Sequence, residues 1–404
     1  MLTATSAAIV TATLPLLKAH GEEVTGRFYQ RMFEENPELL NLFNRSNQAT
    51  GQQRQALAAS VVAYAEHLIG NTEAPWNAIL DRIAHKHASL GITPAQYTIV
   101  GRNLIAAVGE VLGEAVTPEI AAAWDETYWL MACELVAREA RLYHTVGVGQ
   151  EIDVWRQWRV TGRTVETDDV VSFTLEPVDG SPVPSFTPGQ YVSVAVDLDE
   201  NDQQIRQYSL SGRPGAPQWQ ITVKRERGTA DSPDGVVSTF LHERIAVGDT
   251  LRLSPAFGEV SAVAGDGPLL LVSAGIGLTP AMSALEYVAE STPDRPVVLA
   301  HADRSEAHHA LRQNLSRLVD QLPNLRVSLW YEEVSSDFWL PAAQVKAGWI
   351  DPELIPLESA SEVDVHLCGP LPFMNLVRGN LLTRGVPTER IGYEVFGPGM
   401  LRSA

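Results

Sequence analysis

The spacing of apolar residues changes twice along this chain, and the changes restrict it to a multidomain fold. Up to about residue 145, apolar residues recur at three and four positions, as in amphipathic helices. Over residues 152–262 they fall in short alternating runs broken by turns, which predicts an antiparallel β-barrel. Over residues 266–404 strand-like runs alternate with helical ones, which is typical of a doubly wound α/β domain. We therefore expect an all-α domain at 1–145 and two further domains with these boundaries.

The charge and cysteine content exclude several classes of protein. The 404 residues include 30 Lys and Arg against 49 Asp and Glu, a net charge of −19. This balance argues against a nucleic-acid or anionic-membrane partner. Cys133 and Cys368 lie far apart, no apolar run is long enough to span a bilayer, and no basic residue precedes Lys18. We expect a monomeric cytoplasmic protein without a disulfide framework, a signal peptide or integral membrane association.

A histidine interrupts an apolar helical stripe. Residues 76–90 carry Ile79, Leu80, Ile83, His87 and Leu90 at helical steps, so His87 is expected to point inward. The polar side of this helix is expected to carry His85, Asp81, Arg82 and Ser89. Taken alone, an inward histidine is more often a core residue bonded to a backbone carbonyl.

Other polar residues lie on apolar stripes of the same domain, and together they indicate a buried polar cavity. They are Tyr29, Gln53, Tyr97 and Glu139. A haem would account for the whole set. His87 would ligate the iron through one ring nitrogen and donate its other N–H to Glu139, to which Tyr97 would also donate. On the opposite face the Tyr29 hydroxyl and the Gln53 amide would bond dioxygen, between apolar walls formed by Phe43 and Leu57.

The barrel carries a pattern that suits a flavin. In the run Arg206-Gln207-Tyr208-Ser209-Leu210, Arg206 and Tyr208 share one face of a strand, so they can meet a diphosphate and a flat ring together. Ser209 can bond a ring nitrogen, and the turn Pro188-Gly189-Gln190 presents a second aromatic residue, Tyr191. Val237-Ser238-Thr239 opens a short helix whose amides suit a pyrophosphate. The alternative is an arginine and tyrosines at an ordinary sheet edge.

The third domain has a glycine loop between a buried strand and a helix. In residues 273–280, Gly275 and Gly277 let the backbone approach a phosphate at a helix N-terminus. The loop is not a complete dinucleotide fingerprint, because Pro280 stands at the third glycine position. A packing turn is the alternative.

The first domain resembles the globin domain of flavohaemoglobins. The resemblance rests on Phe28-Tyr29-Gln30-Arg31-Met32-Phe33, Asn36-Pro37-Glu38-Leu39, Phe43-Asn44, 52–57 and Lys86-His87. It implies that His87 is the proximal ligand, that Tyr97 and Glu139 form a proximal charge-relay pair, and that Lys86 lies near haem and flavin. It also implies a distal pocket formed by Tyr29, Phe43, Gln53 and Leu57. His85 before the motif is a small departure.

The rest of the chain resembles ferredoxin-reductase-type modules, so the resemblance covers essentially all of it. It rests on the flavin pentapeptide 206–210, the glycine loop, Leu367-Cys368-Gly369-Pro370 and the ending 393–398. It implies that Cys368 lies near the nicotinamide, Phe396 against the flavin and Glu394 near the flavin–haem gap. The implied cofactor contacts are Tyr191, Arg206, Gln207, Tyr208, Ser209, Val237, Ser238, Gly275, Ile276, Gly277, Leu278, Thr279, Pro280, Cys368, Gly369, Pro370, Val395, Phe396, Gly397 and Pro398. Residues 254–259 depart from the common form, and 335–356 stay unassigned.

This resemblance implies a nitric oxide dioxygenase. Electrons would pass from NAD(P)H through FAD to haem b, and O2 bound there would oxidise nitric oxide to nitrate, which detoxifies it. Two alternatives stay open. One is an oxygen-binding or sensing globin with its own methaemoglobin reductase, and the other is an NAD(P)H flavin reductase, or diaphorase, of other acceptors. Asp303 and Arg304, where ribose would lie, leave NADH or NADPH undecided.

Overall fold

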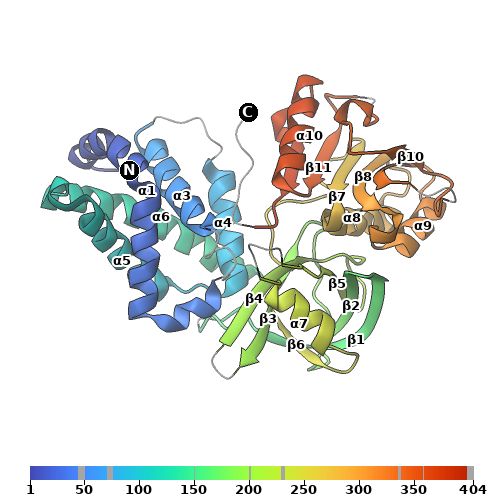
Figure 1. Cartoon of the computed structure of the whole chain (residues 1–404), viewed down its shortest axis with the longest axis horizontal. Helices are drawn as coiled ribbons and strands as arrows, with labels where there is room; N and C mark the ends of the chain where they lie inside the picture. Colours follow the sequence, from blue (N-terminus) through green and yellow to red (C-terminus); the bar gives the residue numbers. More distant parts are fainter. Residues whose placement is uncertain are drawn as a thin grey trace. The chain divides into compact units, whose positions relative to one another are not determined.

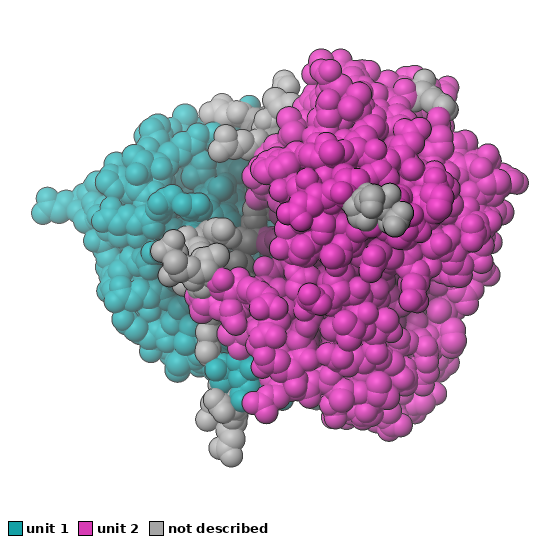
Figure 2. Space-filling model, turned by 45° about the vertical axis from the view of Figure 1, so that its right-hand side comes forward, with its two compact units in different colours: residues 1–154, 197–205 teal, residues 155–196, 206–404 magenta. Residues whose placement is uncertain are grey.

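The chain forms two compact units in the computed structural model (Figures 1 and 2). One unit comprises residues 1–154 with 197–205, and the other comprises 155–196 with 206–404. The structure describes residues 1–43, 51–70, 76–149, 151–199, 202–228, 233–334, 338–357 and 359–397. Within those ranges no helix is both long and apolar enough to cross a bilayer.

Residues 1–154 of the first unit are helical, as predicted, whereas its residues 197–199 and 202–205 belong to strands of the antiparallel sheet described below. Its elements are α1 (Ala4–Glu35), η1 (Pro37–Leu42), α3 (Gln52–Leu68), α4 (Trp76–Leu90), α5 (Pro94–Leu112), η2 (Gly113–Ala115) and α6 (Pro118–Thr145). Two helix starts follow from local chemistry. Thr93 and Gln96 form a capping box before α5, and the Thr117 side chain accepts from the Ile120 amide before α6. In both helices proline occupies the first turn, where its missing N–H costs nothing.

The burial of α4 differs in detail from the sequence expectation. The most deeply buried row is Leu80, Ala84 and Ala88, which belongs to the face packed on α6. Ile83 and His87 lie beside this row and are only partly buried. Ser89, expected on the polar side, is fully buried, and its hydroxyl donates to the Lys86 carbonyl oxygen at 2.8 Å. The short serine side chain satisfies itself within the helix and can therefore be buried at low cost.

The second unit begins with an antiparallel sheet in the order β4-β3-β6-β1-β2-β5. Its elements are β1 (Arg156–Thr167), β2 (Val170–Pro177), β3 (Tyr191–Asp199), β4 (Asp202–Ser209), β5 (Trp219–Lys224), α7 (Val236–Arg244) and β6 (Thr250–Leu253). The rings of Trp158 and Trp219 stack in its core with centroids 4.1 Å apart. The alternating residues therefore form the predicted sheet around one apolar interior.

The unit continues with a parallel sheet in the order β10-β9-β8-β7-β11-β12. Its strands are β7 (Leu269–Ala274), β8 (Val297–Ser305), β9 (Leu325–Glu333), β10 (Gln344–Ala347), β11 (Asp364–Cys368) and β12 (Ile391–Glu394). Its helices are η3 (Gly275–Gly277), α8 (Leu278–Ser291), η4 (Glu306–His308), α9 (Arg312–Gln321), η5 (Pro352–Leu354), α10 (Leu371–Thr383) and η6 (Thr388–Arg390). Strand β10 and helix η5 lie within the stretch that the sequence left unassigned.

The strand order places a ligand site at one edge of this sheet. Strand β7 pairs with β8 on one side and with β11 on the other, so the chain order reverses between β7 and β11. In open α/β sheets, ligands bind outside the carboxyl ends of the strands at such a reversal. Leu270 and Leu367 pack with α10 on one face, whereas Leu271 packs with α8 and α9 on the other (Figure 1).

Candidate functional site

Three side chains from three helices meet on the proximal side of the expected haem pocket. His87 Nδ1 lies 2.9 Å from Glu139 Oε1 and 2.9 Å from the Tyr97 hydroxyl. The Tyr97 hydroxyl donates to the same carboxylate oxygen at 2.5 Å. The structure thus brings together His87, Tyr97 and Glu139, as predicted from their positions on apolar stripes.

This arrangement fixes the form of the imidazole. Burial, reinforced by the neighbouring Glu139, holds the pKa of Tyr97 well above its usual range, so the phenol keeps its proton and donates it. The carboxylate accepts, so His87 Nδ1 carries a hydrogen, which leaves Nε2 as the ring nitrogen that can ligate a metal. A neutral imidazole with an oriented N–H and a free lone pair is the form that ligates a metal.

The surroundings of His87 fit a flat apolar group. Glu139 is 3% exposed in its side chain, whereas the His87 side chain is 33% exposed. Ile83, one turn earlier on α4, is also only partly buried. Hydrogen bonds therefore hold the imidazole on its buried side. Its other side is open and lies near the partly buried Ile83, which suits contact with a flat apolar group such as haem.

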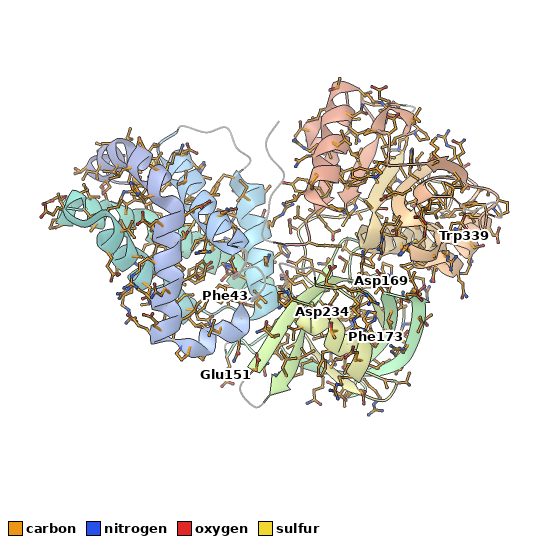
Figure 3. The ribbon with its side chains drawn as sticks, in the orientation of Figure 1. Phe43, Glu151, Asp169, Phe173, Asp234 and Trp339 are labelled. Atoms are coloured by element: carbon orange, nitrogen blue, oxygen red, sulfur yellow. The ribbon has the colours of Figure 1, made fainter. Side chains whose placement is uncertain are left out.

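Three of the predicted distal residues, Tyr29, Phe43 and Leu57, belong to or pack against one apolar cluster. Tyr29 on α1 is 6% exposed, and its ring lies 5.7 Å from that of Phe43, which follows η1 (Figure 3). Leu57 on α3 packs against this cluster, and Gln53 occupies the first turn of the same helix. Lys86 lies on α4 next to His87. The distal and electron-transfer roles of these residues stay predictions.

The two segments that carry the flavin pattern are joined by backbone hydrogen bonds. The Leu210 amide, just after β4, donates to the Gln190 carbonyl oxygen at 3.0 Å. Gly189 has a φ of +102°, and a Cβ there would lie 2.5 Å from the Val260 carbonyl oxygen. Only glycine fits this turn, which places Tyr191 beside the strand of Arg206, Gln207, Tyr208 and Ser209. Burial raises the pKa of Tyr208, so its phenol stays neutral.

Helix α7 begins one residue earlier than predicted, at Val236, and its N-terminus fits a pyrophosphate. Its first turn contains Val237 and Ser238 and holds no acidic residue, and no side chain in the described part of the chain caps it. Uncapped amides and the positive end of the helix dipole favour an anion.

The glycine loop lies at the sheet's reversal point. Gly275, Ile276 and Gly277 form η3 after β7, and α8 starts with Leu278, Thr279 and Pro280, uncapped by any side chain. A Cβ on Gly277 would collide with the Cys368 carbonyl oxygen, so this loop and Gly369-Pro370 after β11 pack backbone to backbone. The close approach leaves amides at the strand ends, where a dinucleotide phosphate fits.

The C-terminal segment returns to the flavin pattern. Glu394 ends β12, pairs in register with Cys368, and accepts a hydrogen bond of 3.3 Å from the Ser209 hydroxyl. Cys368 is buried, which raises its pKa and keeps the thiol neutral. Val395, Phe396 and Gly397 follow, and Phe396 is 51% exposed. Pro398 lies outside the described residues.

These features define a class: a haem-binding globin fused to an NAD(P)H-dependent flavin oxidoreductase. Family models agree with each part, since residues 26–135 match the globin family, 157–261 the oxidoreductase FAD-binding domain and 271–379 the oxidoreductase NAD-binding domain. A flavohemoprotein of Bordetella pertussis is 44% identical over 397 residues, which cover 97% of this chain and 98% of the relative.

Solved structures agree as well. A flavohemoglobin from Malassezia yamatoensis with bound FAD and haem superposes with a TM-score of 0.85 at 31% identity, over 98% of this chain and all of that one. The FAD/NAD-binding domain of a nitric oxide dioxygenase from Vibrio cholerae matches with a TM-score of 0.54 at 34% identity, over 60% of this chain and 99% of that one.

The chain belongs to the flavohaemoglobin family. Its cofactors are haem, FAD and NAD(P)H, and its electrons pass from NAD(P)H through FAD to haem.

Two charged contacts of this unit were not anticipated. The Glu394 carboxylate accepts a hydrogen bond from His366 on β11, with Oε1 2.9 Å from Nε2. Arg304 Nη2 lies 3.0 Å from Asp169 Oδ2 in the turn between β1 and β2 (Figure 3). His366 lies two residues before Cys368, so strand alternation puts both on one face, a signal that the sequence already contained. The Arg304 pair depends on packing between distant segments and had no such signal.

Proposed function

We propose that this flavohaemoglobin is a nitric oxide dioxygenase that consumes nitric oxide, O2 and NAD(P)H and releases nitrate. The observation that carries the proposal is the hydrogen-bonded set of His87, Glu139 and Tyr97. A carboxylate behind the proximal imidazole makes that ligand more electron-rich, which favours O2 activation over storage. The matching reductase domain of the Vibrio cholerae protein belongs to an enzyme of this name, which supports the same activity here.

The residues of this chain would divide the work between two sides of the pocket. Haem, when bound, supplies the iron that takes electrons and binds O2. Glu139 accepts from the imidazole N–H and so holds the His87 ring in one orientation, while Tyr97 holds Glu139 in place. The Tyr29 hydroxyl would donate a hydrogen bond to O2 held in the pocket and so favour negative charge there. Apolar Phe43 and Leu57 exclude water.

A nitric oxide electrode tests the proposal. Protein loaded with haem and FAD should remove nitric oxide rapidly only when NADH and O2 are both present, and nitrate should accumulate. A protein that holds O2 but consumes nitric oxide no faster with NADH would be an oxygen-binding or sensing globin. A protein that oxidises NADH with added acceptors yet leaves nitric oxide untouched would be a diaphorase.

We further propose that NADH is the preferred donor. An arginine at the carboxyl end of the second strand of the sheet would suit a 2′-phosphate. Arg304 lies there, inside the last residues of β8, but it is already paired with Asp169. The Asp303 carboxylate accepts from the Arg304 amide at 2.8 Å and adds negative charge at the same place. A 2′-phosphate would have to displace one carboxylate and approach another, whereas a free 2′-hydroxyl would not.

Replacing Asp169 by asparagine should therefore favour NADPH. The Asp169→Asn change keeps an oxygen for the Thr167 hydroxyl but removes the charge that holds Arg304. Because exposed ion pairs contribute about 0.2–1 kcal/mol, the ratio of kcat/KM for NADPH to that for NADH should rise by about 1.4- to fivefold. Steady-state ferricyanide reduction measures it. Asp168→Asn, an equal charge change at the exposed neighbouring residue, should leave the ratio unchanged, and equal shifts in both variants would refute the pairing argument.

A further inference from the structure

The edge of the parallel sheet buries a hydrogen-bonded histidine and carboxylate that the activity described so far does not use. His366 has a side-chain exposure of 2% and Glu394 of 10%, and His366 Nε2 lies 2.9 Å from Glu394 Oε1. Burying a carboxylate and an imidazole costs free energy unless each is the hydrogen-bond partner of the other. The cost of burying this pair therefore indicates that it has a role in the site.

Strand register explains how the two residues meet. Strands β11 and β12 are parallel, with His366 opposite Gly392 and Cys368 opposite Glu394. Val365 and Leu367 face the α10 side, so His366, Cys368 and Glu394 share the opposite face. Glu394 lies two residue pairs further along this ladder, on the face that also carries His366.

The same carboxylate reaches the flavin pattern of the barrel with its second oxygen. Glu394 Oε2 accepts from the Ser209 hydroxyl at 3.3 Å, while Oε1 accepts from His366. A Cβ on Gly189 would lie 3.2 Å from Glu394 Oε1, so the turn that precedes Tyr191 presses against this carboxylate. Glu394 thus bridges His366 and the segments expected to hold the flavin ring.

We propose that His366 is a positioning residue of the flavin site, which holds Glu394 ionised and turned toward Ser209 so that this carboxylate can accept a proton from the flavin. The inference deepens the proposed function and rests on the assignment of Ser209 to the flavin.

The stoichiometry of electron transfer requires such an acceptor. A hydride from NADH brings two electrons and one proton to the flavin. Haem iron takes the electrons one at a time and takes no proton. One proton must therefore leave the flavin for each NADH oxidised, and a carboxylate bonded to the Ser209 hydroxyl is placed to receive it.

The electrostatics show why the carboxylate needs the histidine. Burial raises the pKa of Glu394, and the nearby Glu259 raises it further, whereas the hydrogen bond and charge of His366 lower it. Among the described residues, the buried thiol of Cys368 also interacts with it, and Glu394 contributes to the raised pKa of that thiol. Without His366 the balance would shift toward a protonated carboxyl, which cannot accept a proton.

A pH series on the full-length protein loaded with FAD tests the proposal. Anaerobic reduction of the flavin by NADH, and its reoxidation by ferricyanide, are followed by stopped-flow absorbance. His366→Phe should move the pH profile of reoxidation upward by about one to two units, the effect of removing one hydrogen bond from a buried carboxylate. His366→Gln, which keeps an N–H near the same place but carries no charge, should move the profile part of the way back toward that of the wild type. These readouts involve neither haem nor nitric oxide, so a failure here differs from a failure of the dioxygenase assay.

A double-mutant cycle and an infrared spectrum separate positioning from a general loss of structure. In a Glu394→Gln background, His366→Phe should cause no further shift. At neutral pH the wild-type protein should lack the protonated-carboxyl band that is assigned by its loss in Glu394→Gln, and His366→Phe should show it. If that band is present in the wild-type protein, or if the pH shift persists in the Glu394→Gln background, the proposal is overturned. The wild-type spectrum decides even if His366→Phe fails to fold.

Discussion

His87→Ala should yield a protein that binds FAD normally but has lost its haem. The His87 imidazole is oriented to ligate iron, since Glu139 and Tyr97 both contact its Nδ1 side. Loss of outer-shell partners alone costs metal sites about 10–100-fold, so NADH-dependent nitric oxide consumption should fall by more than about a hundredfold. The Soret absorbance and the flavin absorbance of the purified variant measure the two cofactors separately.

His85→Ala is the matched control, because it removes an imidazole from the same helix at a different angle around its axis. We expect this variant to keep its haem and its activity. Free imidazole added to His87→Ala should restore part of the Soret band by occupying the space of the lost ring. If haem stays in His87→Ala and leaves in His85→Ala, the proximal assignment is wrong.

Tyr29→Phe should release O2 faster and oxidise nitric oxide more slowly. The ring is held by Phe28, Phe33 and Phe43, so phenylalanine should occupy the same place without its hydroxyl. A hydrogen bond to a group that carries charge contributes about 1.5–3 kcal/mol, so the O2 dissociation rate should rise about ten- to hundredfold. Stopped-flow displacement of O2 from the ferrous protein by carbon monoxide measures that rate.

Tyr143→Phe provides the comparison for this experiment. Its hydroxyl donates to the Ile92 carbonyl oxygen at 2.8 Å, so the variant removes a buried tyrosine hydroxyl from α6 rather than from the distal side. We expect its O2 dissociation rate to match the wild-type value. An unchanged rate in Tyr29→Phe, or an equal increase in both variants, would rule out the distal hydrogen bond.

The spacing of apolar residues in helices and strands was enough to predict most of the fold and the proximal site. Helical spacing alone preferred His87 over His85 and put Glu139 and Tyr97 on buried stripes, and the structure joins all three through short hydrogen bonds. The same spacing placed Ser89 wrongly, because a serine that bonds its own helix can be buried as if it were apolar. The spacing of apolar residues predicts which side of a helix a residue faces. It does not show which hydrogen bonds the polar atoms of that residue make.

Contacts between segments that are distant in the chain could not be predicted from the sequence. His366 and Glu394 meet because two parallel strands separated by α10 take a particular register, and a shift of one residue would part them. Arg304 pairs with Asp169 across 135 positions of sequence. Only the packed unit brings these side chains together. The Arg304–Asp169 contact supports the proposed preference for NADH, and the His366–Glu394 contact supports the proposed proton acceptor.

Isotope labelling of the product tests the central claim most directly. The protein loaded with haem and FAD is given NADH, nitric oxide and O2 labelled with heavy oxygen, and the nitrogen oxyanions are identified by mass spectrometry. A dioxygenase inserts both atoms of one O2 molecule, so the account predicts nitrate that carries two labelled oxygen atoms. Nitrite as the main product, or nitrate without the paired label, would contradict it.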